Sequence, residues 1–158
     1  VTGQAALFAG DALPALDLAA ERQRLHAVLA AFDAGWIEAC HDVGDGGLVL
    51  ALLEMIWGRS GLPRLGVECD LGADASPLAC RLFSEAPGYV CAVRSEASPA
   101  FETACAAHAV QPQLLGSVTS APRLVVRCGS RTALDVAAEP LARRWREGLA
   151  AVFAEGSA

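Results

Sequence analysis

The sequence predicts an α/β (α+β) sandwich with a partly parallel sheet. Segments of helical periodicity alternate with short apolar strand patterns along most of the chain, and such alternation is typical of α/β proteins. The length of 158 residues suits one domain with a substantial core, and the sequence contains no internal repeat. We therefore expect one domain with helices packed on a mixed sheet.

The first half of the chain supplies the clearest elements. Residues 1–14 have no period and are interpreted as a linker or the remnant of a preceding element. Residues 17–34 are predicted to form a helix that ends at Gly35, because apolar side chains recur at helical spacing. These side chains are Leu18, Leu25, Val28, Leu29 and Phe32. A short strand over residues 36–40 then leads through a glycine-rich turn into a helix over residues 48–57.

The second half continues the alternation. Residues 65–71 alternate as a half-buried strand does, and residues 89–93 form a continuous apolar run, which predicts a central strand. Short helices are predicted over residues 75–83 and 98–108, each with a Ser-Pro pair that suits a first helical turn. The remaining predicted elements are strands at residues 113–119, 124–127 and 132–136 and a last helix at residues 139–153.

Composition excludes several classes of function. The net charge of −6 provides no basic surface for nucleic acid or anionic membranes, and all 12 basic residues are arginine, which excludes a P-loop lysine and Schiff-base chemistry. No apolar run reaches the roughly 18–20 residues of a membrane span. The six cysteines contain no C-x-x-C pair, so we interpret them as buried free thiols of a cytoplasmic protein. A start without methionine suggests a piece of a longer polypeptide.

The stretch over residues 39–48, Ala-Cys-His-Asp-Val-Gly-Asp-Gly-Gly-Leu, holds the main candidate site. A glycine-rich turn that opens a helix presents backbone N–H groups and the positive end of the helix dipole, which favours phosphate. Asp42 and Asp45 add the oxygen ligands that Mg²⁺ takes. An ordinary connection in which Asp45 caps the helix explains the same pattern, and both interpretations stay open at this point.

Other candidates are weaker. For His41, a hydrogen-bonded structural role is favoured over that of a general base. Glu85 is interpreted as a turn glutamate facing water. Asp70 and Asp74 flank a turn that we expect to be a solvated loop. No Ser-His-Asp or Cys-His order is visible, so no catalytic residue is assigned.

Several motifs together resemble phosphoribosylformylglycinamidine synthase. The stretch over residues 39–48, followed by Leu53-Glu54-Met55, is similar to the H-D-x-S-D-G-G-L…A-E-M signature of that family. Leu82-Phe83-Ser84-Glu85 with the strand at residues 90–93 resembles its L-F-[GN]-E…V-x-V segment, and residues 115–119 resemble its I-G-x-V-T strand. The order and spacing match over residues 15–155.

The resemblance implies a C-terminal domain of the aminoimidazole ribonucleotide synthetase type, a three-layer αβα sandwich with a mixed sheet. It implies an ATP-dependent C–N ligase of purine biosynthesis, which uses Mg²⁺, ATP and glutamine-derived ammonia to convert formylglycinamide ribonucleotide to formylglycinamidine ribonucleotide. Its partners would be upstream domains of the same synthetase and a glutaminase domain or subunit, and the isolated domain would be inactive. A homodimer stays open.

Residue by residue, the resemblance makes Asp42 a Mg²⁺ ligand and the turn with Gly44, Gly46 and Gly47 a binding site for nucleotide phosphates. Asp45 would either assist the metal or cap the helix. The chain departs from the family where Gly44 replaces a serine that touches the nucleotide. Two further departures are Ser84 at the [GN] position and Tyr89 in place of a frequent arginine.

Two alternatives remain. One is another member of the superfamily: selenophosphate synthetase, thiamine-monophosphate kinase or a hydrogenase maturation protein. The other is a non-catalytic scaffold or dimerisation domain.

Overall fold

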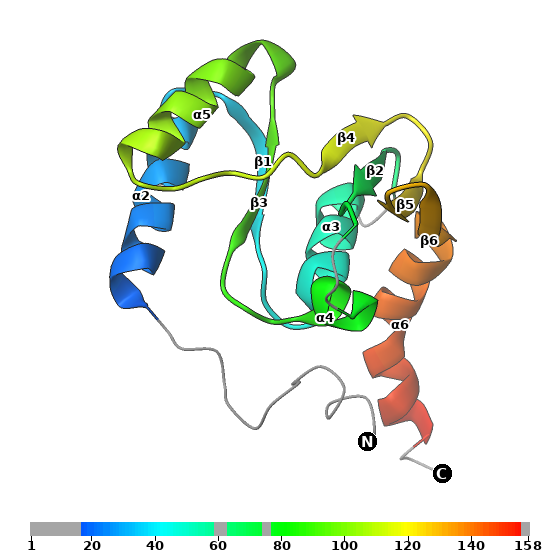
Figure 1. Ribbon diagram of the computed structural model, residues 1–158. Coiled ribbons are helices and arrows are strands. Elements are labelled where there is room, and N and C mark those ends of the chain that lie inside the picture. The colour runs from blue at the N-terminus through cyan, green and yellow to red at the C-terminus, as the bar shows by residue number, and fades with distance from the viewer. Residues whose placement is uncertain (1–16, 59–62, 74–76, 156–158) are drawn as a thin grey trace. The chain divides into compact units, whose positions relative to one another are not determined.

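The computed structural model describes residues 17–58, 63–73 and 77–155 (Figure 1). The predicted linker at residues 1–14 and Ser76, at the start of the predicted helix over residues 75–83, lie outside the described residues. The chain divides into two compact units, and both are built from segments that are distant in the sequence. Each unit is therefore described by itself.

The first unit comprises residues up to 51 and residues 75–114. Its elements are α2 (Leu18–Asp33), β1 (Ile37–Asp42), the start of α3 (Gly47–Trp57), α4 (Leu78–Phe83), β3 (Tyr89–Val93), the 3₁₀ helix η1 (Ser95–Ala97) and α5 (Ser98–Ala107). β1 and β3 pair as an antiparallel two-stranded ribbon, and α2 and α5 lie side by side (Figure 1). The ribbon and α4 position the candidate site.

Local sequence explains both ends of α2. The Asp17 carboxylate accepts hydrogen bonds from the backbone N–H groups of Ala19 and Ala20, at 2.9 and 3.0 Å, and so caps the first turn. Gly35, at φ +70°, takes the left-handed conformation that commonly follows a helix. The predicted start and stop of this helix are confirmed.

The face that α2 buries differs from the expected one. Ala27 and Ala31 are almost fully buried, whereas Leu18 and Phe32 are 72% and 65% exposed. Leu25 and Leu29 are exposed as well. The helix packs beside α5, and small alanine side chains allow neighbouring helices to approach closely. The large apolar stripe found by periodicity is therefore on the exposed side of the helix.

The second unit comprises residues 52–74 and 115–158. Its sheet has the strand order β4-β2-β5-β6, with β2 and β5 parallel and the other pairs antiparallel. The elements are the end of α3, β2 (Gly66–Asp70), β4 (Gly116–Thr119), β5 (Arg123–Cys128), β6 (Arg131–Ala137) and α6 (Ala138–Glu155). Leu124 and Val126 on β5 are fully buried, as expected for a central strand.

The tryptophan pair of the second unit joins α3 to α6. The rings of Trp57 and Trp145 lie with centroids 5.5 Å apart, and the Trp57 indole N–H donates to the backbone carbonyl of Ala138 at 3.2 Å. This hydrogen bond satisfies the one polar group of a side chain that is 4% exposed. The end of α3 is thereby fixed to the start of α6.

The predicted fold class is confirmed: the chain is a mixed α+β structure with a mixed, partly parallel sheet. The prediction that residues 89–93 form a central strand is wrong, because among the described strands β3 pairs with β1 alone. In β3 only Val90 is buried, so the apolar composition of this run fixed neither the burial of its side chains nor the number of neighbouring strands. No helix in the described residues is long and apolar enough to cross a membrane.

Candidate nucleotide and metal site

The acidic turn connects β1 to α3. β1 continues through His41 to Asp42, two residues beyond the strand predicted from sequence, and α3 begins at Gly47. The N–H of Val43 donates to the carbonyl of Gly88 at 2.8 Å, which extends the pairing with the β3 side by one step. The N–H of Gly47 donates to the carbonyl of Gly44 at 2.9 Å and closes the turn. The turn is thus a hydrogen-bonded loop held at both ends.

The structure brings the acidic turn together with the segment that follows α4. The N–H of Gly46 donates to the Glu85 carboxylate at 3.1 Å, although 39 positions separate the two residues. Glu85 is exposed, as expected for a turn glutamate, but it also caps the start of α3. The two segments that carry the family resemblance therefore form one local structure.

Gly47 makes this contact sterically possible. A Cβ atom at position 47 would lie 2.7 Å from the backbone Cα and carbonyl carbon of Phe83, closer than any real Cβ contact. Its φ of +66° is also in the left-handed region that favours glycine. A glycine is required here because the end of α4 packs directly on the start of α3.

Asp42 presents its carboxylate to solvent beside the turn. Its side chain is 73% exposed, and Oδ1 lies 3.4 Å from Nδ1 of His41. The same nitrogen lies 2.7 Å from the backbone oxygen of Asp42, so His41 is a hydrogen-bonded neighbour of the turn. Tyr89 is paired with Asp42 in the β1–β3 register. Asp42 is therefore placed where an incoming cation can reach it.

Position 44 leaves room for the serine that the family carries. A Cβ atom on Gly44 would lie 3.6 Å from Oδ2 of Asp42, an ordinary van der Waals distance, and its φ is not in the left-handed region. The side chain of Asp45 is exposed, and Gly46, not Asp45, stands directly before the first helical residue. A side chain at position 44 would therefore fit without strain.

A metal ion would need ligands from outside this turn. Among the described residues, no group of three or more His, Cys, Asp and Glu side chains is arranged to hold an ion. Mg²⁺ commonly takes only one or two carboxylates and completes its six ligands with water and substrate phosphates. The exposed carboxylates of this turn are those of Asp42 and Asp45.

Two thiols lie next to the turn. Cys40 and Cys91 are paired across β1 and β3, with Sγ atoms 3.5 Å apart. The pKa of Cys40 is lowered to about 7, chiefly by the hydrogen bond from Cys91 and to a smaller extent by the nearby His41, while burial and Asp42 act in the opposite direction. The same hydrogen bond raises the pKa of Cys91, with burial adding to the shift. Sequence spacing gave no indication of this pair.

The prediction of buried thiols holds for only some of the cysteines. Cys69 and Cys105 are buried, whereas Cys40 is exposed. The remaining thiols, which are intermediate in exposure, are Cys80, Cys91 and Cys128.

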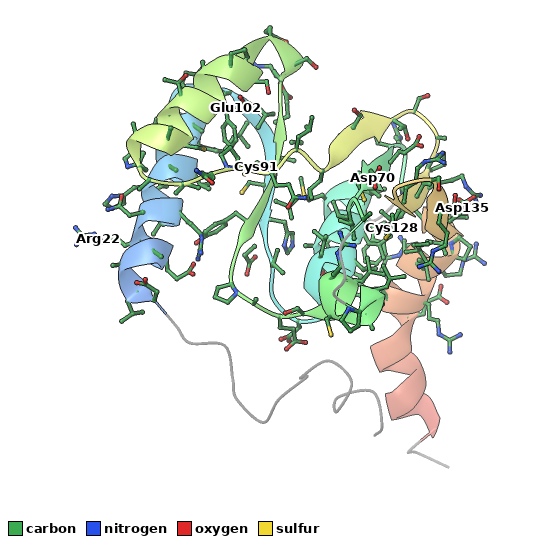
Figure 2. All side chains as sticks on the ribbon, in the orientation of Figure 1. Arg22, Asp70, Cys91, Glu102, Cys128 and Asp135 are labelled. Atoms are coloured by element: carbon green, nitrogen blue, oxygen red, sulfur yellow. The ribbon has the colours of Figure 1, made fainter. Side chains whose placement is uncertain are left out.

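Asp70 differs from the solvated loop residue predicted from the sequence. Its Oδ1 accepts hydrogen bonds from the N–H groups of Gly72 and Gly129, at 2.8 and 2.9 Å, and so ties the end of β2 to the β5–β6 turn (Figure 2). The Asp-x-Gly spacing indicated a local turn, but the contact with Gly129 is a tertiary one. Asp74, its predicted companion, lies outside the described residues.

The comparison of sequences identifies the family. Residues 3–129 match the family described as AIR synthase related protein, C-terminal domain. This match covers well over half of the chain, and the chain belongs to this family. The predicted likeness to the aminoimidazole ribonucleotide synthetase superfamily is confirmed.

Several solved structures with the same fold are of proteins named PurL or PurLQS. PurLQS from Thermotoga maritima matches with a TM-score of 0.72 and 20% identity over 83% of this chain and 23% of that chain. T. maritima PurL complexed with ATP matches with a TM-score of 0.71 and 20% identity, over 80% of this chain and 22% of that chain. T. maritima PurL complexed with FGAR matches with a TM-score of 0.68 and 21% identity, over 89% of this chain and 24% of that chain. The chain thus spans less than a quarter of the length of each of these proteins. At this level of sequence identity, the structural similarity shows a shared fold.

Proposed function

We propose that residues 15–155 form the C-terminal domain of a cytoplasmic phosphoribosylformylglycinamidine synthase. That enzyme converts formylglycinamide ribonucleotide to formylglycinamidine ribonucleotide with ATP and glutamine-derived ammonia. The observation that carries the proposal is the hydrogen bond between Gly46 and Glu85, which unites the two segments that resemble this family. The relatives of the same fold, described as complexes with ATP and with FGAR, support a nucleotide-dependent function.

In this proposal Asp42 would hold Mg²⁺ through one carboxylate, as is common for an ion that also takes water and substrate phosphates. When bound, the ion offsets the negative charge of the nucleotide phosphates. The turn with Gly44, Gly46 and Gly47 faces these phosphates, and Asp45 would be a second ligand of the ion. Since Glu85 accepts the hydrogen bond of Gly46, a phosphate that uses this N–H has to displace the Glu85 carboxylate.

The remaining binding groups belong, in this proposal, to domains upstream in the same synthetase and to a glutaminase domain or subunit. A chain that corresponds to less than a quarter of its relatives would lack most contacts to ATP and substrate. We therefore expect negligible ATP turnover from the chain alone. Robust turnover by the isolated chain would contradict a division of the site between domains.

The test compares Mg-ADP binding by variants of the synthetase that contains this chain, measured by isothermal titration calorimetry. Asp42→Asn removes a charged ligand and should weaken binding at least about tenfold, equal to about 1.4 kcal/mol. Gly44→Ser restores the hydroxyl of the family and should tighten binding about two- to tenfold, the effect of one added hydrogen bond.

The matched control is Asp135→Asn, which removes an exposed carboxylate of the second unit with the same change in charge. It should leave Mg-ADP affinity unchanged. If Asp42→Asn binds Mg-ADP as tightly as this control does, Asp42 is not a metal ligand and the proposed site is wrong.

A second candidate function is a non-catalytic scaffold or dimerisation domain. The exposed apolar stripe of α2 favours it, because contiguous exposed apolar side chains on a helix are typical of contact surfaces. Sedimentation velocity of the chain with and without the change Leu29→Glu distinguishes the cases. A scaffold that self-associates through α2 would dissociate on this change, and Mg-ADP binding by the synthetase would not respond to Asp42→Asn.

A further inference from the structure

The thiol pair on the β1–β3 ribbon has the geometry of a disulfide precursor. Cys40 and Cys91 are directly paired in the antiparallel register, and their Sγ atoms lie 3.5 Å apart. Figure 2 shows Cys91 on β3, beside the neighbouring strand of the ribbon. Closing this distance to a covalent bond of about 2 Å requires a movement of about 1.5 Å shared between two side chains.

The ladder places this pair where strands come closest. Antiparallel residue pairs alternate between hydrogen-bonded and non-hydrogen-bonded positions. The hydrogen bond from the N–H of Val43 to the carbonyl of Gly88 identifies these two residues as a hydrogen-bonded pair. Cys40 and Cys91 form the pair three steps along the same register. They therefore occupy a non-hydrogen-bonded pair, whose Cα separation of about 4.5 Å falls inside the disulfide range of about 4.4–6.8 Å.

Access to the pair is asymmetric. Cys40 is exposed, whereas Cys91 is partly buried. A reagent in solution therefore reaches Cys40 first, and Cys91 is held in place behind it. This arrangement suits a two-step exchange, in which one thiol reacts with the reagent and the other releases it.

We propose that Cys40 and Cys91 form a redox modification site that reacts with small-molecule disulfides to give a reversible cross-strand disulfide. In the first step the Cys40 sulfur, after loss of its proton, attacks one sulfur of the reagent, whose S–S bond breaks and releases one thiolate. In the second step the Cys91 sulfur, after loss of its proton, attacks the Cys40 sulfur. The S–S bond between Cys40 and the reagent breaks, and the second reagent thiolate leaves. The protein is oxidised by two electrons, the reagent is reduced to two thiols, and the released protons balance them.

The site lies beside the acidic turn, because Cys40 precedes Asp42 by two positions on β1. A cross-strand bond would fix β1 to β3 immediately before the turn. The inference itself rests on the thiol geometry and does not depend on nucleotide binding.

The experiment treats the full chain with oxidised glutathione under denaturant-free conditions, quenches with iodoacetamide and maps the peptides by mass spectrometry without reduction. We expect one cross-linked product that joins the peptides of Cys40 and Cys91, with a mass lower by two hydrogen atoms. Dithiothreitol should restore both thiols. Recovery of Cys40 and Cys91 as separate alkylated peptides, or of a lasting glutathione adduct on Cys40, would overturn the proposal.

Variants separate the two steps. Cys91→Ser should retain glutathione on Cys40 as a stable mixed disulfide, because no second thiol releases it, and Cys40→Ser should yield no cross-link at this ribbon. Cys105→Ser, at a buried cysteine of the same unit, is the matched control and should still form the Cys40–Cys91 bond. If Cys91→Ser shows no adduct while its circular dichroism is unchanged, Cys40 is not the attacking thiol and the mechanism is wrong.

Discussion

Replacement of Gly47 by alanine tests whether the acidic turn and the end of α4 are joined as the structure indicates. The added methyl group would meet backbone atoms of Phe83 at 2.7 Å and the carbonyl oxygen of Leu82 at 2.9 Å. Backbone atoms cannot turn aside as a flexible side chain does, so α3 and α4 would have to separate. We expect the Gly46–Glu85 hydrogen bond to be weakened by the same movement.

The magnitude follows from two contributions. A non-glycine residue in the left-handed conformation costs about 1–2 kcal/mol, and overpacking of a rigid contact adds about 1–3 kcal/mol. The lower entropy of alanine in the unfolded chain offsets about 0.4–1 kcal/mol. We therefore expect Gly47→Ala to lower the free energy of unfolding by about 2–4 kcal/mol.

Gly35→Ala is the matched control in the same unit. Gly35 has a φ of +70°, close to that of Gly47, but a Cβ atom there meets only the end of the Arg94 side chain, at 3.9 Å. This variant carries the backbone contribution alone and should lose about 1 kcal/mol. Urea denaturation measures both values. An equal loss in both variants would refute the contact between Gly47 and α4.

Two further predictions concern the second unit. Asp70→Ala removes the acceptor for the Gly72 and Gly129 N–H groups and should lower the free energy of unfolding by about 1–3 kcal/mol. Asp70→Asn keeps an acceptor oxygen and should lose less in the same urea assay; equal losses would show that the oxygen is not the cause. Burial, with added repulsion from Asp70, raises the pKa of the Cys69 thiol from 9.0 to about 11. The folded state favours the neutral thiol. The contribution of Cys69 to the free energy of unfolding is therefore fully present below pH 9.0 and is lost as the pH rises toward about 11. Unfolding free energies measured from pH 8 to 11 should fall less steeply in Cys69→Ala, and identical slopes would contradict this.

The sequence determined much of the local structure of this protein. Helical periodicity, a capping aspartate and a following glycine located α2, and an apolar run located β3, because these properties depend on neighbouring residues along the chain. The sequence also singled out the acidic turn and the Leu82–Glu85 segment, because their residue order resembles one family.

Only the tertiary structure decided which segments meet. The contacts of Gly46 with Glu85, of Cys40 with Cys91 and of Asp70 with Gly129 each join residues at least 39 positions apart. Periodicity carries no information on such pairings, which depend on strand register and on where helices end. For the same reason the sequence located the apolar residues of α2 but not its buried face, since the alanines at positions 27 and 31 are buried and most of the larger apolar side chains remain exposed.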